Sequence, residues 1–172
     1  MASRTELFDL GSLSLASGEA SRVEAAVRLD PFSFGGQDYV VEGEGAEVVL
    51  DVSRTTSEGY SLRLRLVAAV EGPCVRCLEV ADQPMEVDAW EVDQPGGGED
   101  LDSPYVDADE LDLKGWARDA LALALPVQIL CRVDCRGLCP VCGENLNEAG
   151  PEHVHEQAPD PRWSKLGELK LD

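Results

Sequence analysis

The sequence has few basic residues. Lys and Arg together number 14, against 34 Asp and Glu, so the formal net charge of this 172-residue chain is −20. Because a surface that neutralises phosphates needs an excess of basic residues, direct, tight binding to nucleic acid is not expected. The excess of carboxylates suits a basic protein partner, which opposite charge would steer into contact. The same charge is also compatible with a role in solubility alone.

Long apolar runs are missing as well. The best candidate, ALALALPV at 120–127, is interrupted by Pro126, so no membrane-spanning segment is predicted. The N-terminus shows no apolar signal-peptide core and carries Glu6 and Asp9 early. The sequence therefore predicts a cytoplasmic protein without membrane association. In that compartment, clustered cysteines more often bind metal than form disulfides.

Aromatic residues make up only 5% of the chain, so the core is expected to be mainly aliphatic. Apolar residues alternate with polar ones in several segments, which is typical of strands with one buried face. Such strands are predicted at 21–29, 46–54, 60–72 and 84–93, with a turn at Gly35 and Gly36 and a hairpin turn at Gly59. In the last strand the apolar parity changes between Val87 and Trp90, which predicts a β-bulge.

One helix is predicted after an acidic loop. Asp109 is expected to cap it, and Pro126 to end it. Its apolar face, at three- and four-residue steps, is formed by Leu113, Trp116, Ala117, Ala120, Leu121 and Ala124. This stripe is expected to pack on the sheet. A last short helix is predicted from Pro161.

These patterns predict an α+β fold. An antiparallel β-meander, either a small barrel or an open sheet, is packed by a helix within residues 1–126. Residues 127–172 are predicted to form a cysteine-rich, zinc-binding tail with a zinc-knuckle-like loop, which is not expected to be an independent domain.

Four cysteines, Cys131, Cys135, Cys139 and Cys142, lie in one short stretch, which the chain's two histidines, His153 and His155, follow. The two-residue spacing of Cys139 and Cys142 lets both sulfurs reach one tetrahedral ion. Pro140 presets its own φ, and Gly143 can adopt the positive φ that a tight turn needs. The sequence therefore predicts a structural zinc site.

Spacing alone does not assign the ligands. The set favoured by proximity is Cys131, Cys135, Cys139 and Cys142. A second set combines Cys139 and Cys142 with ligands taken from Cys135, His153 and His155. A third joins the pair Cys74 and Cys77, which also has two-residue spacing, to Cys139 and Cys142. With eight candidate ligands, two sites are a further alternative, while Cys74 and Cys77 could instead be small buried residues or a redox pair.

Signs of catalysis are few. A catalytic zinc keeps an open coordination position, whereas a thiolate-rich ligand set favours a closed site. Glu144, next to the knuckle, could act as a base, but only its proximity suggests it. The sequence has no phosphate-cradling glycine loop before a helix and no nucleophile elbow. No catalytic residue is therefore predicted.

Three segments together resemble the YceD family, named for large ribosomal RNA subunit accumulation. They are EGPCVRCLE at 71–79, LALALPVQILCRVDCRGLCPVCGENLNE at 121–148 and DPRWSKL at 160–166. The resemblance implies a non-enzymatic factor that supports accumulation or processing of large-subunit ribosomal RNA and ribosome assembly. In the family the cluster commonly continues into a cysteine-x-cysteine pair. Its positions match His153 and His155 here, which favours the second ligand set.

Family resemblance and charge together predict action through a basic protein partner, either a ribosomal protein or another assembly factor. The acidic run around 99–112 and the zinc-ordered loop would form its surface. Two rivals stay open. One is a zinc-dependent RNA-processing hydrolase, and the other is a redox-sensing zinc protein.

Overall fold

A computed structural model of the chain describes residues 3–4, 7–43, 45–56, 58–98 and 101–155. The short helix predicted from Pro161, and most of the predicted tail beyond residue 155, lie outside the described residues. The main sheet contains β1 (Ser3–Arg4), β3 (Ala20–Val27), β4 (Phe32–Phe34), β5 (Gln37–Val41), β6 (Ala46–Arg54), β7 (Tyr60–Pro73) and β8 (Val80–Asp93). A small sheet contains β2 (Phe8–Asp9), β9 (Val106–Asp107) and β10 (Glu110–Leu111), and one helix, α1, spans Leu113–Ala124.

The main sheet is an antiparallel meander, as predicted, and it is open. Strands β8, β7, β6 and β3 are hydrogen-bonded in that order, and β1 adds a short parallel pair at the outer edge of β3. The β4–β5 hairpin turns at Gly35 and Gly36 and pairs with the far end of β7. Of the two predicted alternatives, the open sheet is therefore confirmed over the small barrel.

Alternation in the sequence decides which face of the sheet is buried. In β7, Leu62, Leu64 and Leu66 are buried, whereas Arg63 and Arg65 point to the other face. Leu50 of β6 pairs directly with Leu64 and is also fully buried. On the polar face, Asp51 accepts from both Arg22 and Arg65, so cross-strand ion pairs replace apolar contacts there.

The predicted β-bulge in β8 is wrong. The register between β7 and β8 runs without interruption from Tyr60 opposite Asp93 to Pro73 opposite Val80. Trp90 simply lies on the polar face, 64% exposed, where the Arg63 guanidinium stacks 4.8 Å from its ring centroid. The parity change therefore reflects an aromatic residue covered by an arginine, and the strand needs no extra residue.

The helix packs where its stripe predicts, but its N-cap lies three residues later than predicted. Asp112 is the N-cap, and its side chain accepts from the N–H of Gly115 at 2.8 Å. Asp109 instead accepts from the Tyr60 hydroxyl and from Arg54. Ala124, predicted on the buried face, is exposed, whereas Leu121 in the same turn is fully buried.

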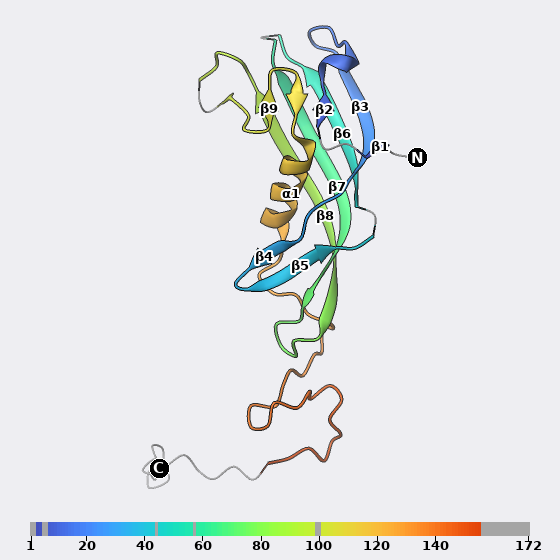
Figure 1. Cartoon of the computed structure of the whole chain (residues 1–172), viewed down its shortest axis with the longest axis vertical. Coiled ribbons are helices and arrows are strands. Elements are labelled where there is room, and N and C mark those ends of the chain that lie inside the picture. The colour runs from blue at the N-terminus through green and yellow to red at the C-terminus, as the bar shows by residue number, and fades with distance from the viewer. Residues whose placement is uncertain (1–2, 5–6, 44, 57, 99–100, 156–172) are drawn as a thin grey trace, which may run out of the picture.

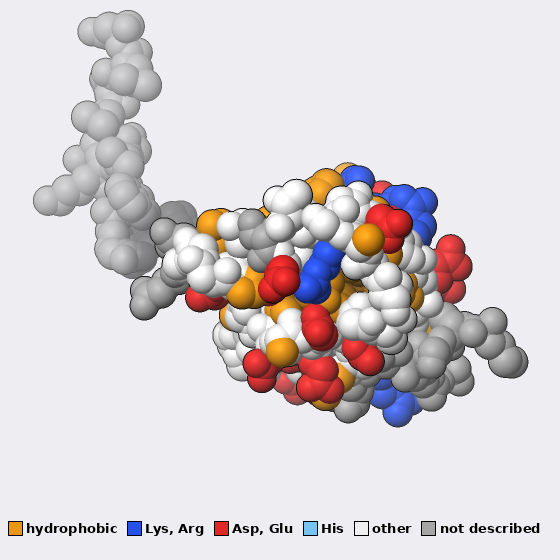
Figure 2. Space-filling view, turned by 90° about the horizontal axis from the view of Figure 1, so that it is seen from above, with side chains coloured by type: hydrophobic (Ala, Val, Ile, Leu, Met, Phe, Trp, Pro, Cys, Tyr) orange, Lys and Arg blue, Asp and Glu red, His pale blue; other side chains and the backbone are white. Residues whose placement is uncertain are grey.

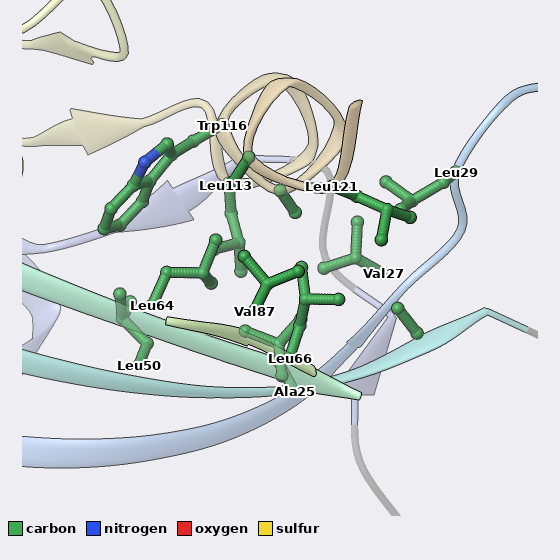
Figure 3. Packing of buried hydrophobic residues seen from close by; sticks show 14 of the residues in the cluster. Ala25, Val27, Leu29, Leu50, Leu64, Leu66, Val87, Leu113, Trp116 and Leu121 are labelled. Atoms are coloured by element: carbon green, nitrogen blue, oxygen red, sulfur yellow. The ribbon is translucent and has the colours of Figure 1, made fainter. Parts of the chain in front are cut away.

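Figure 3 shows how the helix and the sheet share one aliphatic core. Leu113 points from α1 toward Leu64 and Val87, and Leu121 lies beside Leu29 and Val27. Trp116 belongs to the same core. Burying large aliphatic side chains contributes roughly 1.5–3 kcal/mol each, so this layer supplies much of the stability. No helix in the described part of the chain is long and apolar enough to cross a membrane.

The turn between β7 and β8 lies at the lower end of the main sheet (Figure 1). After α1 the chain runs down past this turn, and its next described segment extends beyond it (Figure 1). The topology thus brings the cysteines of the turn next to those that follow the helix.

Candidate metal centre

The six cysteines and two histidines form two groups in the described residues. The first contains Cys74, Cys77, Cys131 and Cys135, and the second contains Cys139, Cys142, His153 and His155. Within each group, the candidate ligand atoms lie within 4.8 Å of one another. All six cysteines are free thiols. Both groups have the donor types and the number that a tetrahedral metal ion needs.

The first cluster joins the β7–β8 turn to the segment after α1. The sulfur of Cys74 lies 3.8 Å from that of Cys135, and the sulfur of Cys77 lies 3.6 Å from that of Cys131. All of these cysteines except Cys131 are buried. Since sulfur atoms around one zinc ion are a few ångströms apart, these four thiols are close to the arrangement of a four-sulfur site.

Backbone hydrogen bonds hold the segment after α1 against the turn. The N–H of Val75 donates to the carbonyl of Ile129 at 2.9 Å, and the N–H of Leu138 donates to the carbonyl of Arg76 at 3.2 Å. The Arg76 guanidinium also donates to the carbonyl of Cys135 at 2.9 Å. A small apolar cluster, separate from the main core, surrounds the thiols and includes Ala81 and Ile129.

The thiols of the first cluster differ in acidity. Burial opposes ionisation of Cys74, but the backbone groups of Cys131, Cys77 and Arg76 donate to its sulfur and lower its pKa to about 6. The pKa of Cys131 is instead raised to about 12, by desolvation and by the neighbouring thiols of Cys77, Cys135 and Cys74. A thiolate therefore forms easily at Cys74, and its negative charge is one of the causes that oppose ionisation of Cys131. A divalent cation would remove that repulsion.

The second cluster is more exposed. The sulfur of Cys142 lies 3.6 Å from Nε2 of His153, and Nε2 of His155 lies 3.1 Å from the same Nε2. Nδ1 of His153, on the other side of the ring, lies 3.0 Å from a carboxylate oxygen of Glu144. Cys142 and His155 are exposed, His153 is half-buried and Cys139 is buried.

Hydrogen bonds within the second cluster favour a thiolate at Cys139. The His153 side chain, followed by the backbone groups of Cys142 and Val141, lowers the pKa of Cys139 to about 6. In return, Cys139 is the main reason why the pKa of His153 is raised. Backbone groups of this turn thus help to stabilise a charged sulfur.

The two cysteine turns share one backbone pattern. In the first, the N–H of Leu78 donates to the carbonyl of Cys74 at 2.9 Å, and the N–H of Cys74 donates to the carbonyl of Glu79 at 2.7 Å. In the second, the N–H of Gly143 donates to the carbonyl of Cys139, and the N–H of Cys139 to the carbonyl of Glu144, both at 2.8 Å. The turn at Cys74 is therefore a knuckle of the same type as the predicted one.

Both knuckles place a left-handed residue directly after the second cysteine. Gly143 has φ +76°, which confirms the expectation of a positive φ. Leu78, at the corresponding position, has φ 64°, an unfavourable conformation for a side-chain-bearing residue. Residues with side chains rarely adopt this conformation unless the surroundings hold it, and here the hydrogen bonds of Leu78 and Glu79 with the Cys74 backbone close the turn around it.

The structure divides the ligands that proximity in sequence grouped together. Cys131 and Cys135 face Cys74 and Cys77, while Cys139 and Cys142 face the histidines. The favoured local set is therefore not assembled, nor is the third set. The second set matches in its version with both histidines, and the two-site alternative matches the grouping as a whole. Metal binding by any set stays a prediction.

Sequence reasoning undervalued Cys74 and Cys77. A signal was present, because Cys74-x-x-Cys77-Leu78-Glu79 repeats the pattern Cys139-x-x-Cys142-Gly143-Glu144 with only the glycine replaced. The leucine hid the likeness, since a positive φ is not expected for leucine.

The chain is similar to one protein family and to uncharacterized mycobacterial proteins. Residues 62–170, which include both clusters, match the model of a family described as large ribosomal RNA subunit accumulation protein YceD. An uncharacterized protein of Mycobacterium tuberculosis (strain ATCC 25618 / H37Rv) is 36% identical over 142 residues, covering 78% of this chain and 67% of that protein. An uncharacterized protein of Mycobacterium leprae (strain TN) is 31% identical over 142 residues, covering 78% and 64%. No solved structure matches the chain significantly.

Proposed function

This chain belongs to the YceD family of large ribosomal RNA subunit accumulation proteins, and we propose that it supports ribosome assembly by binding a basic protein partner, without catalysis. The observation that carries the proposal is the family match across both cysteine clusters, on a chain with a net charge of −20. The charge disfavours direct contact with ribosomal RNA, so a basic ribosomal protein or assembly factor is the expected contact. A cytoplasmic setting stays part of the same proposal.

In this proposal the first cluster holds a structural zinc ion. Its donors are four thiols, which suit Zn²⁺ and leave no coordination position for a substrate. The residues fit the ion because three of the cysteines are buried beside a turn whose backbone groups already stabilise a thiolate. The bound ion would fix the segment from Ile129 to Leu138 against the β7–β8 turn. Structural zinc contributes an apparent binding free energy of roughly 10–16 kcal/mol at neutral pH, enough to order this segment.

An acidic surface lies close to the first cluster. Glu42, Glu71 and Asp82 are exposed, with carboxylate oxygens within 4.8 Å of one another. Glu71 and Asp82 are opposite each other in the β7–β8 register, shortly before the turn that carries Cys74 and Cys77. Within the described residues these carboxylates have no Lys or Arg partner, so their mutual repulsion would be relieved by a basic partner.

Two carboxylates of the acidic run around 99–112 already have partners within the protein. Residues 99 and 100 lie outside the described residues. Asp109 is paired with Arg54 and Tyr60, and Asp112 caps α1. Acidic side chains with a few basic ones among them are visible around the end of the molecule seen in Figure 2. The three-carboxylate surface of Glu42, Glu71 and Asp82 is therefore the better candidate for the partner contact.

The proposal excludes a catalytic role for Glu144, because its carboxylate is engaged by Nδ1 of His153. A carboxylate that orients a potential ligand is not free to accept a proton from a substrate. The hydrolase alternative predicts metal-dependent RNA cleavage by the pure protein, which we do not expect.

The function can be tested in a mycobacterial strain depleted of its own relative, with the ratio of large- to small-subunit ribosomal RNA as the readout. The wild-type chain should restore the ratio, whereas the triple variant Glu42→Lys, Glu71→Lys and Asp82→Lys should not. A control with the same charge change on the polar sheet face, Glu24→Lys, Glu47→Lys and Glu86→Lys, should restore it. Pull-downs should recover basic ribosomal proteins or assembly factors in a salt-sensitive manner. Salt-resistant binding to naked ribosomal RNA, with no basic protein recovered, would overturn the proposal.

A further inference from the structure

We propose that Cys139, Cys142, His153 and His155 bind a second Zn²⁺ ion, and that the Glu144 carboxylate is the positioning residue of this site. The inference goes beyond the proposed function and shares with it only the premise that thiols of this chain hold zinc. It requires two ions in one chain, held by different donor sets.

The histidine rings are already turned toward the thiols. Nε2 of His153 lies 3.6 Å from the sulfur of Cys142 and 3.1 Å from Nε2 of His155. Two unprotonated imidazole nitrogens repel each other through their lone pairs. Such a short distance therefore requires a proton on one nitrogen or a cation that both nitrogens face. With the two thiols, they form a group of four donors whose ligand atoms lie within 4.8 Å.

Glu144 determines which nitrogen of His153 faces the cluster. Its carboxylate can only accept, so Nδ1 of His153, 3.0 Å away, donates to it. Nε2 is then the nitrogen that faces the thiols. In the metal-free protein it can donate to Cys139, and in the neutral ring it presents a lone pair to a cation. A carboxylate that holds a histidine in this way is typical of zinc sites, where it fixes the tautomer and increases the basicity of the ligand.

The other knuckle offers an internal comparison. Glu79 occupies the position that corresponds to Glu144, and both residues accept a backbone N–H from the first cysteine of their knuckle. No histidine belongs to the cluster at Cys74, and exposed Glu79 takes part in that knuckle through its backbone, which accepts from the N–H of Cys74 and hydrogen-bonds to the thiol of Cys77. Within the described residues, the side chain at this position therefore has an ion-pair partner only at Glu144, beside a histidine.

The two sites are expected to differ in how readily they exchange metal. Three of the four donors are buried in the first cluster, against one in the second. Water and chelators reach an exposed donor more easily. Metal should therefore leave the site at Cys142 and His155 faster than the site at Cys74.

Native mass spectrometry of the full chain, purified reduced and loaded with Zn²⁺, tests the number of sites. We expect two zinc ions for the wild type. The double variant His153→Ala and His155→Ala should hold one, and Cys77→Ser should lose the other ion while keeping the one at the histidines. Zinc release to a chromophoric chelator should show two phases, of which the fast one disappears in the histidine variant. Far-ultraviolet circular dichroism will show whether each variant keeps the β-sheet fold.

Cobalt substitution tests the role of Glu144. Co²⁺ bound by two thiolates and two imidazoles absorbs differently from Co²⁺ bound by four thiolates, so each site can be titrated in the same sample. Glu144→Ala should weaken the mixed-donor site by about 10- to 100-fold, whereas Glu144→Gln, which keeps an acceptor, should weaken it less. The matched variant Glu79→Ala should leave both sites unchanged.

Three results would overturn the inference. The first is a single zinc ion in the wild type, and the second is loss of both ions together in the histidine variant, which would indicate one shared site. The third is equal behaviour of Glu144→Ala and Glu79→Ala. Metal counts do not depend on ribosomal RNA levels, so a failure here is distinguishable from a failure of the proposed function.

Discussion

The side-chain amide of Asn147 donates to the sulfur of Cys135, with Nδ2 and Sγ 3.3 Å apart. Asn147 lies between Cys142 and His153 in the sequence, so the loop of the second cluster hydrogen-bonds to a thiol of the first. The side-chain oxygen of Asn147, Oδ1, accepts from the backbone N–H of Arg136 at 2.8 Å, and this contact fixes the orientation of the side-chain amide. This hydrogen bond is the main cause of the lowered pKa of Cys135.

Asn147→Leu is expected to weaken zinc binding at the first cluster. The variant keeps a side chain of similar size but removes the N–H that stabilises the Cys135 thiolate. Changes in groups that support a metal ligand typically cost about 10- to 100-fold in affinity, and a single neutral donor should lie at the lower end. Competition with a chromophoric chelator measures the effect. Glu148→Leu, at a nearby exposed position, is the control, and equal affinities for the two variants would contradict the account.

The two left-handed positions should respond in opposite directions to substitution. Leu78→Gly removes the strain of φ 64° at a half-exposed side chain and should stabilise the metal-loaded protein, by up to about 1 kcal/mol. Gly143→Ala introduces the same strain at φ +76°, and an added Cβ meets no atom within 4 Å, so the expected loss of roughly 1 kcal/mol is a backbone effect. Metal affinities of the two sites report each change separately. Effects of the same sign would show that the knuckles are not equivalent.

Trp116 and Trp90, which lie on opposite faces of the sheet, provide a test of the core. Trp116 is 3% exposed and packs between α1 and the sheet, so Trp116→Ala should lower the free energy of unfolding by about 3–5 kcal/mol. Trp90 is 64% exposed and contacts Arg63, so Trp90→Ala should cost less than about 1 kcal/mol. Urea unfolding curves give both values. A large loss at Trp90 would argue for the β-bulge that the sequence predicts.

How far the sequence predicts this fold depends on which interactions decide each feature. Strands 46–54 and 60–72 were predictable because alternation in β6 and β7 directly encodes a buried face. The N-cap was misplaced because Asp109 and Asp112 are equally good caps locally. Only the tertiary contact of Asp109 with Tyr60 and Arg54 separates them.

The ligand grouping could not be predicted from spacing. Cys74 and Cys131 are far apart in the sequence, and only the pairing of β7 with β8 and the path of the chain after α1 bring them together. The family resemblance predicted that the histidines could be ligands. Their contact with Cys142 was also easier to predict because only a short loop separates these residues in the sequence.

Tyr60 should titrate at unusually high pH. Burial, then the hydrogen bond and the negative charge of Asp109, raise its pKa to about 12. Because the folded-state pKa lies above the unfolded value of about 10, the stability contributed by the neutral phenol is complete below pH 10 and is lost as the pH rises toward 12. Phenolate absorbance should show this late step, and Tyr60→Phe should remove it along with the associated alkaline loss of stability. A variant that still shows the step would assign it to another tyrosine.

The central claim is that the four cysteines following the helix belong to two separate metal sites, two cysteines to each. Anomalous diffraction at the zinc absorption edge, from crystals of the zinc-loaded full chain, tests it most directly. We predict one peak among the sulfurs of Cys74, Cys77, Cys131 and Cys135, and a second between Cys139, Cys142 and the two histidines. A single peak enclosed by Cys131, Cys135, Cys139 and Cys142 would contradict the account.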